Sequence, residues 1–401
     1  MTFGDLVVAP DAPVLSGDAA TVSASTADYP WRDRTTLIRW DTPGAFTHSL
    51  TPSPAHTLAR AMGYSDDVHP EYGAEYLLNN SSLRNTDVRF TVTARSFAIR
   101  YVSYTQSEAM VWIDGRPARA TPIAADGVNG KFRWIRVDLP TRRTVSVRFA
   151  GPMVFTGVDH DAEEPIEVRQ AEVPLTLGIV ADSFYEQAYH VRDGVNLVPP
   201  TPMSAAPMLG TLTGFRVWNM AENGTGYVND GSSASAGGIG SPPYLSSPFG
   251  SDRRMDALAK APIDALLVNG SLNDVHHSAA DHRVAVDRFL DEVARRRPDL
   301  PVVLVGIEPI HVEHIFPGSR PHLTALNDTL RAAADRHPNV VGFVDPFEEA
   351  WLTGTGSTAS PRGDGNQDRY VGPDGIHLGS AGQAYYQARI VEQLRLMRLE
   401  P

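Results

Sequence analysis

The spacing of apolar residues changes partway along the chain, and this change limits the folds that the chain can adopt. From about residue 36 to 150 apolar and polar residues alternate, as in Val88-Arg89-Phe90-Thr91-Val92. A period of two indicates half-buried β-strands. After about residue 175, short runs of Val, Ile and Leu alternate with longer segments of helical periodicity. This second pattern is typical of a parallel sheet covered by helices on both faces, so we predict two domains of different class.

The first domain is predicted to be an antiparallel β-sandwich of the jelly-roll type over residues 31–158. Its candidate strands include 96–104, 109–119 and 131–139, and Asp114-Gly115 supplies a tight hairpin turn. Residues 1–30 are rich in Ala, Ser, Thr, Asp and Pro and indicate an extended N-terminal arm. The acidic stretch 159–174 indicates the linker to the second domain.

The second domain, residues 175–401, is predicted to be a five-stranded, parallel, doubly wound α/β domain. Its candidate strands are 175–180, 215–219, 264–270, 301–307 and 340–345. A final helix is expected over about 379–398, where Tyr386, Ile390 and Leu394 share one face with Met397. The segment 229–250, rich in Gly, Ser and Pro, is expected to be a long loop.

Composition excludes several classes of function. The net charge of −12 and the lack of a dense Lys/Arg stripe argue against nucleic acid as a partner. No apolar run approaches the roughly 20 residues of a membrane span, so we expect no membrane insertion. The absence of cysteine excludes disulfides, thiolate metal sites and cysteine nucleophiles.

The N-terminus lacks the features of a secretory signal, because Asp5 precedes a very short apolar run and no basic region is present. The expected location is therefore cytoplasmic by default, or extracellular if a leader was removed. The sequence does not indicate an oligomeric state.

Four polar segments follow or flank the predicted strands of the α/β domain, where ligands of such sheets bind. They are Asp182-Ser183, Asn219 to Gly224, Asn273-Asp274, and the pair Asp374 and His377. Taken singly, each has an ordinary structural explanation, as a helix cap or as turn chemistry. Taken together, they supply a hydroxyl nucleophile, a base, an acid that orients the base, and donors for an oxyanion.

With these four blocks in this order, residues 175–398 resemble the SGNH hydrolases, also called the GDSL esterase/lipase family, whose catalytic domain is flavodoxin-like. The resemblance implies Ser183 as nucleophile, His377 as general base and then acid, and Asp374 as the residue that orients His377. It also implies an oxyanion hole made by the N–H groups of Ser183 and Gly224 and the side-chain amide of Asn273. Two positions depart from the family pattern, since Ala181 and Ser271 stand where Gly is usual.

A β-sandwich before an SGNH domain is similar to the architecture of carbohydrate esterases that deacetylate polysaccharides. We therefore predict a serine esterase that acts on an O-acyl ester of a carbohydrate or polysaccharide and needs no cofactor. The alternatives are a lipid or small-molecule esterase or an acyltransferase. A glycan-binding or virion surface protein with an inactive SGNH scaffold is an alternative of another class, although a scaffold would need no Ser, Asp and His.

Side chains near the four blocks are candidates for substrate contacts, namely Asp182, Tyr185, Tyr227 and His276, although aromatic residues in such places are more often packed inside. No metal site is expected. The residues Asp364, Asn366 and Asp368 have the spacing that begins a calcium loop, but the pattern then fails. His311 and His314 lack an evident third ligand.

Overall fold

The computed structural model describes residues 1–6, 14–28, 30–39, 42–48, 86–103, 108–124, 131–151, 153–186, 191–192, 195–196, 202–222, 224–231, 247–308, 310 and 318–399. The chain divides into two compact units. One comprises Met1–Val8, Pro174–Pro199 and Ser204–Pro401, and the other comprises Ala9–Val173 and Pro200–Met203.

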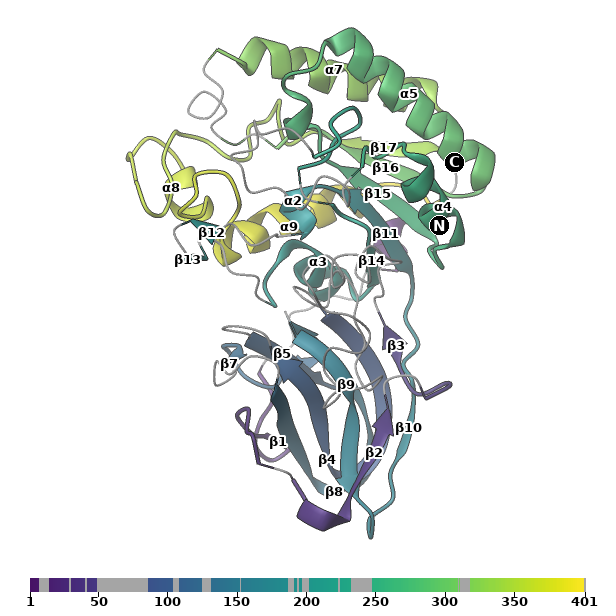
Figure 1. The fold of residues 1–401 in the computed structure, drawn as a ribbon, viewed down its shortest axis with the longest axis vertical. Helices are drawn as coiled ribbons and strands as arrows, with labels where there is room; N and C mark the ends of the chain where they lie inside the picture. The colour runs from purple at the N-terminus through teal and green to yellow at the C-terminus, as the bar shows by residue number, and fades with distance from the viewer. Residues whose placement is uncertain are drawn as a thin grey trace. The chain divides into compact units, whose positions relative to one another are not determined.

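The unit that comprises Ala9–Val173 and Pro200–Met203 is an antiparallel β-sandwich, as predicted (Figure 1). Among the described residues its main strand order is β2-β9-β4-β8-β5-β6. The strands are β1 (Thr21–Val22), β2 (Thr35–Arg39), β3 (Thr47–His48), β4 (Thr86–Ser103), β5 (Glu108–Ile113), β6 (Arg116–Pro117), β7 (Ile123–Ala124), β8 (Lys131–Gly151), β9 (Met153–Asp161) and β10 (Glu167–Gln170). The long strands β4 and β8 pair from Thr86↔Gly151 to Ala94↔Arg143 and, after a register shift, from Ser96↔Asp138 to Ser103↔Lys131.

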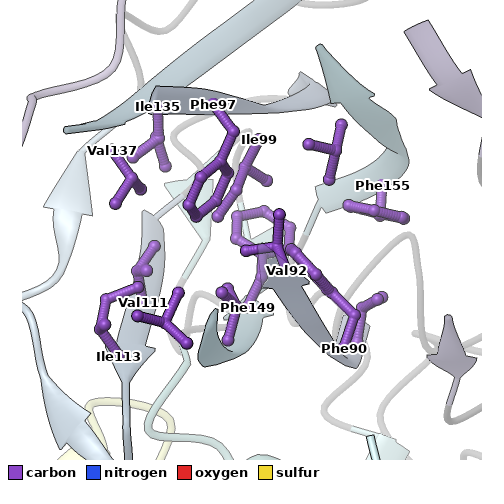
Figure 2. Close-up of a cluster of buried hydrophobic side chains, with 14 of the residues drawn as sticks. Phe90, Val92, Phe97, Ile99, Val111, Ile113, Ile135, Val137, Phe149 and Phe155 are labelled. Atoms are coloured by element: carbon purple, nitrogen blue, oxygen red, sulfur yellow. The ribbon is translucent and has the colours of Figure 1, made fainter. Parts of the chain in front are cut away.

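The core of the sandwich follows from the alternation in the sequence. On each side of the register shift between β4 and β8 alternate residues point into the core, and Phe90, Phe97, Ile99 and Phe149 are fully buried there (Figure 2). The rings of Phe90 and Phe97 meet edge to face with centroids 6.3 Å apart. Burying one such side chain stabilises the fold by roughly 1.5–3 kcal/mol.

Two predicted boundaries of this domain were wrong. The stretch 159–174 is not a linker, because β9 continues to Asp161 and β10 pairs with β4 from Glu167↔Thr93 to Gln170↔Phe90. Strand β10 has mostly exposed side chains, so its polar composition resembles that of a linker. Residues 1–30 are not one extended arm, because β1 pairs with β8.

The first residues of the chain belong to the α/β unit. The short 3-10 helix η1 (Phe3–Asp5) buries Phe3, whose N–H donates to Met397 O at 3.0 Å. A second 3-10 helix, η2 (Arg32–Arg34), precedes β2 in the sandwich. The N-terminal segment is therefore divided between the two units.

The α/β unit has a parallel sheet in the order β14-β11-β15-β16-β17, five strands among the described residues. The strands are β11 (Thr176–Ala181), β14 (Arg216–Asn219), β15 (Ala265–Asn269), β16 (Val302–Val305) and β17 (Val340–Val344). In chain order this is 2-1-3-4-5, the flavodoxin-like order. Each strand lies within about a residue or two of its predicted range, so the predicted fold is confirmed.

Helices cover both faces of this sheet. Figure 1 shows α5 and α7 together on one face, and α3 with α9 on the other. The helices are α2 (Ser183–Glu186), α3 (Ala205–Thr213), α4 (Asp252–Lys260), η4 (Leu272–Asp274), α5 (Ala279–Arg296), α7 (Arg320–Arg336), α8 (Gln367–Tyr370) and α9 (Ser380–Leu394). A small antiparallel pair, β12 (Val191–Arg192) and β13 (Val195–Asn196), follows α2. Within the described part of the chain, no helix combines the length and apolarity needed to cross a membrane.

The spacing of apolar residues in α9 explains which face of this helix is buried. Its buried face includes Tyr386, Ile390 and Leu394, at the spacing that the sequence predicted. Most of the loop predicted over 229–250 lies outside the described residues.

The strand order also places the candidate site. Strands β11 and β15 are neighbours. The connection after β11 leads to β14 at one edge of the sheet, and the connection after β15 leads to β16, toward the other edge. In sheets of this kind the crevice beyond the carboxyl ends of two such strands is where ligands bind. Ser183 follows β11 and Asn273 follows β15.

Candidate active site

Three side chains from distant parts of the chain form a continuous hydrogen-bonded series. His377 Nε2 lies 2.8 Å from Ser183 Oγ, and His377 Nδ1 lies 2.6 Å from Asp374 Oδ2. In this arrangement Asp374 fixes the imidazole ring, and the ring presents its other nitrogen to the serine hydroxyl. The structure thus brings together the three residues that the sequence singled out as nucleophile, base and orienting acid.

The loop that carries Asp374 and His377 is held by its own backbone. Asp374 Oδ1 accepts from the N–H groups of Ile376 and His377 at 3.0 Å each. Gly375 has φ +78°, a left-handed conformation that favours glycine in this turn. The ring of Phe184 packs against the imidazole with centroids 5.5 Å apart. The histidine is therefore fixed both by hydrogen bonds and by packing.

The environment keeps Asp374 ionised. Burial alone would raise its pKa, but the hydrogen bond and charge of His377 and the two backbone donors outweigh burial and lower the pKa below its ordinary value. A carboxylate in this position stabilises the positive charge that His377 acquires when it takes a proton.

Ser183 is the first residue of α2, and Asp182 caps this helix. Asp182 Oδ1 accepts from Phe184 N–H at 3.0 Å, which is the usual bond of a capping aspartate. The N–H of Ser183 has no acceptor within the helix, because the first N–H groups of a helix have no intrahelical partner. Ala181, in place of the usual Gly, ends β11 in paired strand conformation opposite Asn269. That backbone conformation places no special demand for glycine.

The two other candidate oxyanion donors are Gly224, in the loop after β14, and Asn273, in η4, and these two segments contact each other. Gly224 has φ +71°, a conformation that L-residues other than glycine rarely adopt. Asn273 Nδ2 donates to Asp182 Oδ2 and to Thr225 O, at 3.0 Å each. These two bonds bring Asn273 next to the residue before Ser183 and next to the residue after Gly224.

A group of buried carboxyl side chains lies around this region, and we call it the acid cluster: Asp182, Asp274 and Glu308, each fully buried. Burial raises the pKa of Asp182 to about 7, against the opposing effects of Phe184 N–H, His377 and Arg254. Burial also raises the pKa of Glu308 well above its ordinary value, and the nearby charge of Asp182 adds to this. Perturbed carboxyl groups of this kind are typical of functional sites.

One buried arginine connects the strand ends that carry the site. Arg254 donates to Ala181 O at 3.3 Å, to Met220 O at 2.9 Å and to Thr225 Oγ1 at 3.0 Å. Its guanidinium also lies over the ring of Phe249, 4.8 Å from the centroid. Arg254 thereby holds the ends of β11 and β14 and the Gly224 loop together.

Three of the four predicted substrate contacts have buried side chains that bond or pack inside the fold. Tyr185 is 1% exposed and its hydroxyl donates to Gln387 Oε1 at 3.0 Å, while Asp182 is the buried helix cap described above. Tyr227 is 4% exposed and packs edge to face on Phe289. These side chains support the site from within the fold. His276 is exposed, and its role in substrate binding stays a prediction.

The calcium-like loop uses its carboxylates to bind its own backbone. Asp364 Oδ1 accepts from Thr355 N–H at 2.9 Å, and Asp368 accepts from the N–H groups of Arg362 and Gly363. Within the described ranges, no group of three or more potential ligand side chains is arranged to hold a metal ion. His311 and His314 lie outside the described residues.

The sequence interpretation missed Asp274, Arg254 and Glu308. The pattern around Asn273-Asp274 predicts only turn chemistry for Asp274. The structure instead shows that a Cβ at Gly226 would overlap both carboxylate oxygens of Asp274. The signal available in the sequence for their contact was Gly226, close to the block that ends at Gly224, and Asp274, in the block with Asn273. No sequence pattern marks Arg254, which lies within an ordinary polar helix.

Comparison with protein families gives one match. Residues 212–385 match the model of the GDSL-like lipase/acylhydrolase family. This segment contains Gly224, Asn273, Asp374 and His377, while Ser183 precedes it. No curated protein matches the sequence.

Several solved structures share the fold over both units. A carbohydrate esterase family 2 enzyme with a carbohydrate-binding domain, from Corynascus thermopiles (Myceliophthora fergusii), has 17% identity and a TM-score of 0.55, with 87% of this chain and 98% of that chain covered. A family two carbohydrate esterase from Clostridium thermocellum in complex with cellohexaose has 16% identity and a TM-score of 0.50, with 78% and 93% covered.

A third solved structure is the salicylyl-acyltransferase SsfX3 from a tetracycline biosynthetic pathway. It has 13% identity and a TM-score of 0.50, with 95% of this chain and 99% of that chain covered. At these identities the likeness shows the shared fold. The matched family model spans most of the α/β unit, so this unit is similar to GDSL-like lipase/acylhydrolase domains, and it holds a Ser-His-Asp series at its candidate site.

Proposed function

We propose that this chain is a serine esterase that removes an O-acyl group, such as acetyl, from a carbohydrate through an acyl-enzyme on Ser183. The observation that supports this most strongly is the hydrogen-bonded series from Asp374 through His377 to Ser183, with distances of 2.6 and 2.8 Å. A serine held this way is a nucleophile with its base already in place.

The first half-reaction forms the acyl-enzyme. Ser183 Oγ attacks the acyl carbonyl while His377 Nε2 takes the hydroxyl proton, and the carbonyl oxygen becomes an oxyanion. When the tetrahedral intermediate collapses, the bond from carbon to the leaving oxygen breaks and His377 gives its proton to that alcohol. Asp374 stays ionised throughout and stabilises the imidazolium.

The second half-reaction uses water in place of the alcohol. His377 takes a proton from water, whose oxygen attacks the acyl-enzyme and forms a second oxyanion. Collapse of this intermediate releases the carboxylic acid and returns the proton to Ser183 Oγ. The same donors serve both intermediates.

The proposed oxyanion hole consists of the N–H groups of Ser183 and Gly224 and the amide of Asn273. In the present structure Asn273 Nδ2 bonds Thr225 O and Asp182 Oδ2. We propose that the amide exchanges the neutral Thr225 carbonyl for the oxyanion, because an ionised acceptor forms the stronger hydrogen bond. One such donor typically supplies about 3 kcal/mol of transition-state stabilisation.

Support for a carbohydrate substrate comes from architecture. The two solved esterases are described as carbohydrate esterases, one with a carbohydrate-binding domain and the other bound to cellohexaose, and 98% and 93% of their chains are covered. The partner of this chain would accordingly be an O-acylated sugar or polysaccharide.

The experiment compares the wild type with Ser183→Ala on acetylated glycans and on chromogenic esters of increasing acyl length. We expect acetate release by the wild type, a preference for short acyl chains, and loss of both activities in the variant. Ser96→Ala, which removes a hydroxyl bonded to Asp138 in the sandwich, is a matched control and should keep full activity. Unchanged activity in Ser183→Ala would contradict the proposed mechanism. A wild type active only on long-chain esters would contradict the carbohydrate substrate.

A second candidate function is acyl transfer to an alcohol other than water. It is favoured by the shared fold of the salicylyl-acyltransferase, of which 99% is covered. Because the acyl-enzyme is common to both reactions, the test is to add alcohol acceptors and measure the ratio of transferred to hydrolysed acyl group. Hydrolysis that is unaffected by any acceptor would exclude transfer.

A further inference from the structure

Asp274 makes an unusual set of contacts for a residue next to a candidate oxyanion donor. Its side chain is fully buried, and it accepts from three consecutive backbone N–H groups. These are Tyr227 N at 2.8 Å, Val228 N at 3.0 Å and Asn229 N at 2.8 Å. A single carboxylate therefore binds the whole turn that follows Gly224.

The turn is shaped to receive this carboxylate. Gly226 N–H donates to Asn229 O at 2.9 Å, Thr225 and Asp230 form a β-bridge, and Asn229 Nδ2 donates to Gly224 O. Successive N–H groups that converge in a closed turn form a site for an anion. The absence of a side chain at Gly226 is required, because a Cβ there would overlap the Asp274 carboxylate.

The backbone that carries Asp274 is itself fixed. Ser271, just before η4, has φ +98°, a left-handed conformation that is strained for a non-glycine residue. Its hydroxyl lies 3.0 Å from His282 Nε2, and His282 Nδ1 lies 2.5 Å from Thr329 Oγ1. His282 Nε2 is also 3.6 Å from Asp274 Oδ2. The short helix is thereby held from α5 and α7.

Two adjacent residues of η4 consequently bind the same loop. Asn273 bonds Thr225 O, and Asp274 bonds the three N–H groups that follow Gly226. Gly224 lies immediately before this doubly bound segment.

We propose that Asp274 is a positioning residue that sets the separation between the Gly224 N–H and the Asn273 amide, and thus the width of the oxyanion hole. This inference rests on the proposed function. Displacement of a reacting or stabilising group by about 1 Å can lower a rate by roughly 100-fold. Asp274 touches neither substrate nor Ser183 in this scheme and acts only through the two donors.

The first test is Asp274→Asn, which keeps the size of the side chain but replaces one acceptor oxygen with a donor. We expect kcat to fall by roughly 10- to 100-fold with KM nearly unchanged, because the loss is confined to transition-state stabilisation. Ethylboronic acid, whose tetrahedral adduct on serine places an oxygen in the hole, should bind more weakly by a similar factor.

A second variant avoids changing any charge. In Gly226→Ala the new Cβ meets the carboxylate, so we expect the same fall in kcat and in boronic acid affinity. In an Asp274→Ala background the carboxylate is absent. Gly226→Ala should then lower kcat and boronic acid affinity by a factor several-fold smaller than in the wild type. This non-additivity is the sign that the two residues act on one feature.

The control for stability is Asp87→Asn in the sandwich, which also neutralises a buried carboxylate. It should lower Tm without changing kcat or boronic acid affinity. If Asp274→Asn and Gly226→Ala lower Tm in the same way but keep wild-type kcat and boronic acid affinity, the positioning role is overturned while Ser183→Ala still reports on the mechanism. If Ser183→Ala remains active, the proposed function fails first. If kcat and boronic acid affinity fall together in both variants, the positioning role is supported.

Discussion

The two units of this molecule both bury carboxylates, but they neutralise them in different ways. In the sandwich, Asp87 Oδ2 lies 2.7 Å from Arg148 Nη2, and Asp87 Oδ1 lies 3.2 Å from Arg89 Nε. Burial alone would raise its pKa, but the two arginine charges outweigh burial and lower the pKa to about 2. In the acid cluster of the α/β unit, burial dominates and raises the pKa of Asp182 to about 7.

This difference distinguishes a buried carboxylate that stabilises the fold from buried carboxyl groups that support the candidate site. Asp87 is compensated by two cations, so its ionisation is fixed at neutral pH and it serves the fold. Asp182 and Asp274 are held mainly by N–H groups of the loops that carry Ser183, Gly224 and Asn273. Changes in the first cluster should therefore alter stability, and changes around the second should alter rate.

The largest effect is expected in the triad. Asp374→Asn keeps the size of the side chain but removes the charge that orients His377, so kcat should fall by up to about 10⁴-fold. The free energy of unfolding should change little by comparison. Steady-state kinetics with a chromogenic acetate ester and urea unfolding measure the two quantities, and a large loss of stability with kcat retained would break the comparison.

The next effect is on stability in the sandwich. Asp87→Asn leaves two buried guanidinium groups with less compensation, and removing one partner of a buried pair typically costs about 3–5 kcal/mol. The esterase kcat of the folded protein should be unchanged. Urea unfolding followed by kinetics on the same sample checks both, and a loss of kcat without a loss of stability would show that this cluster serves the site.

A smaller effect on rate is expected for Asn273→Ala. Loss of one oxyanion donor should lower kcat by roughly 10²- to 10³-fold, equivalent to about 3 kcal/mol, with KM nearly unchanged. A matched control is Asn366→Ala, whose amide donates to Trp351 O in the loop that resembles a calcium site. Equal kinetic effects of the two substitutions would remove Asn273 from the proposed oxyanion hole.

The smallest predicted effect is the pH dependence of stability, and its sign differs between the clusters. Asp87 has a pKa of about 2 in the folded chain against 3.8 ordinarily, so it contributes about 2 kcal/mol above pH 4 that is lost as pH falls toward 2. Asp182 binds a proton more tightly when folded, so its contribution is complete below pH 4 and is lost as pH rises toward 7.

Unfolding free energies from pH 2 to 8 for the wild type, Asp87→Asn and Asp182→Asn isolate the two contributions. The unfolding free energy of the wild type minus that of Asp87→Asn should decrease as pH falls toward 2. The unfolding free energy of the wild type minus that of Asp182→Asn should decrease as pH rises toward 7. Slopes of the same sign for both carboxylates would contradict the assignment of opposite environments.

The sequence predicted most of the α/β unit because the signals there are local. A continuous apolar run such as residues 265–268 is typical of a buried strand of a parallel sheet, and the polar residues directly after it mark the carboxyl end of that strand. Ser183, Asp374 and His377 were accessible for this reason.

The remaining features depend on tertiary contacts that no local pattern records. Strand β10 reads as a linker because its mostly exposed residues are polar, although its backbone pairs fully with β4. Tyr185 and Tyr227 lie near the motifs in sequence but point into the core. Asp274 acts on N–H groups 45 to 47 positions earlier in the chain, a separation at which sequence gives no partner.

The most direct test of the central claim is to trap the acyl-enzyme. The enzyme is mixed with an activated acetate ester, quenched in acid within the first turnover, digested and analysed by mass spectrometry. The proposed mechanism predicts one acetyl group on Ser183 in the wild type and none at this position in Ser183→Ala. Turnover of the ester with no acetylated Ser183, or with the acetyl group on another residue, would contradict it.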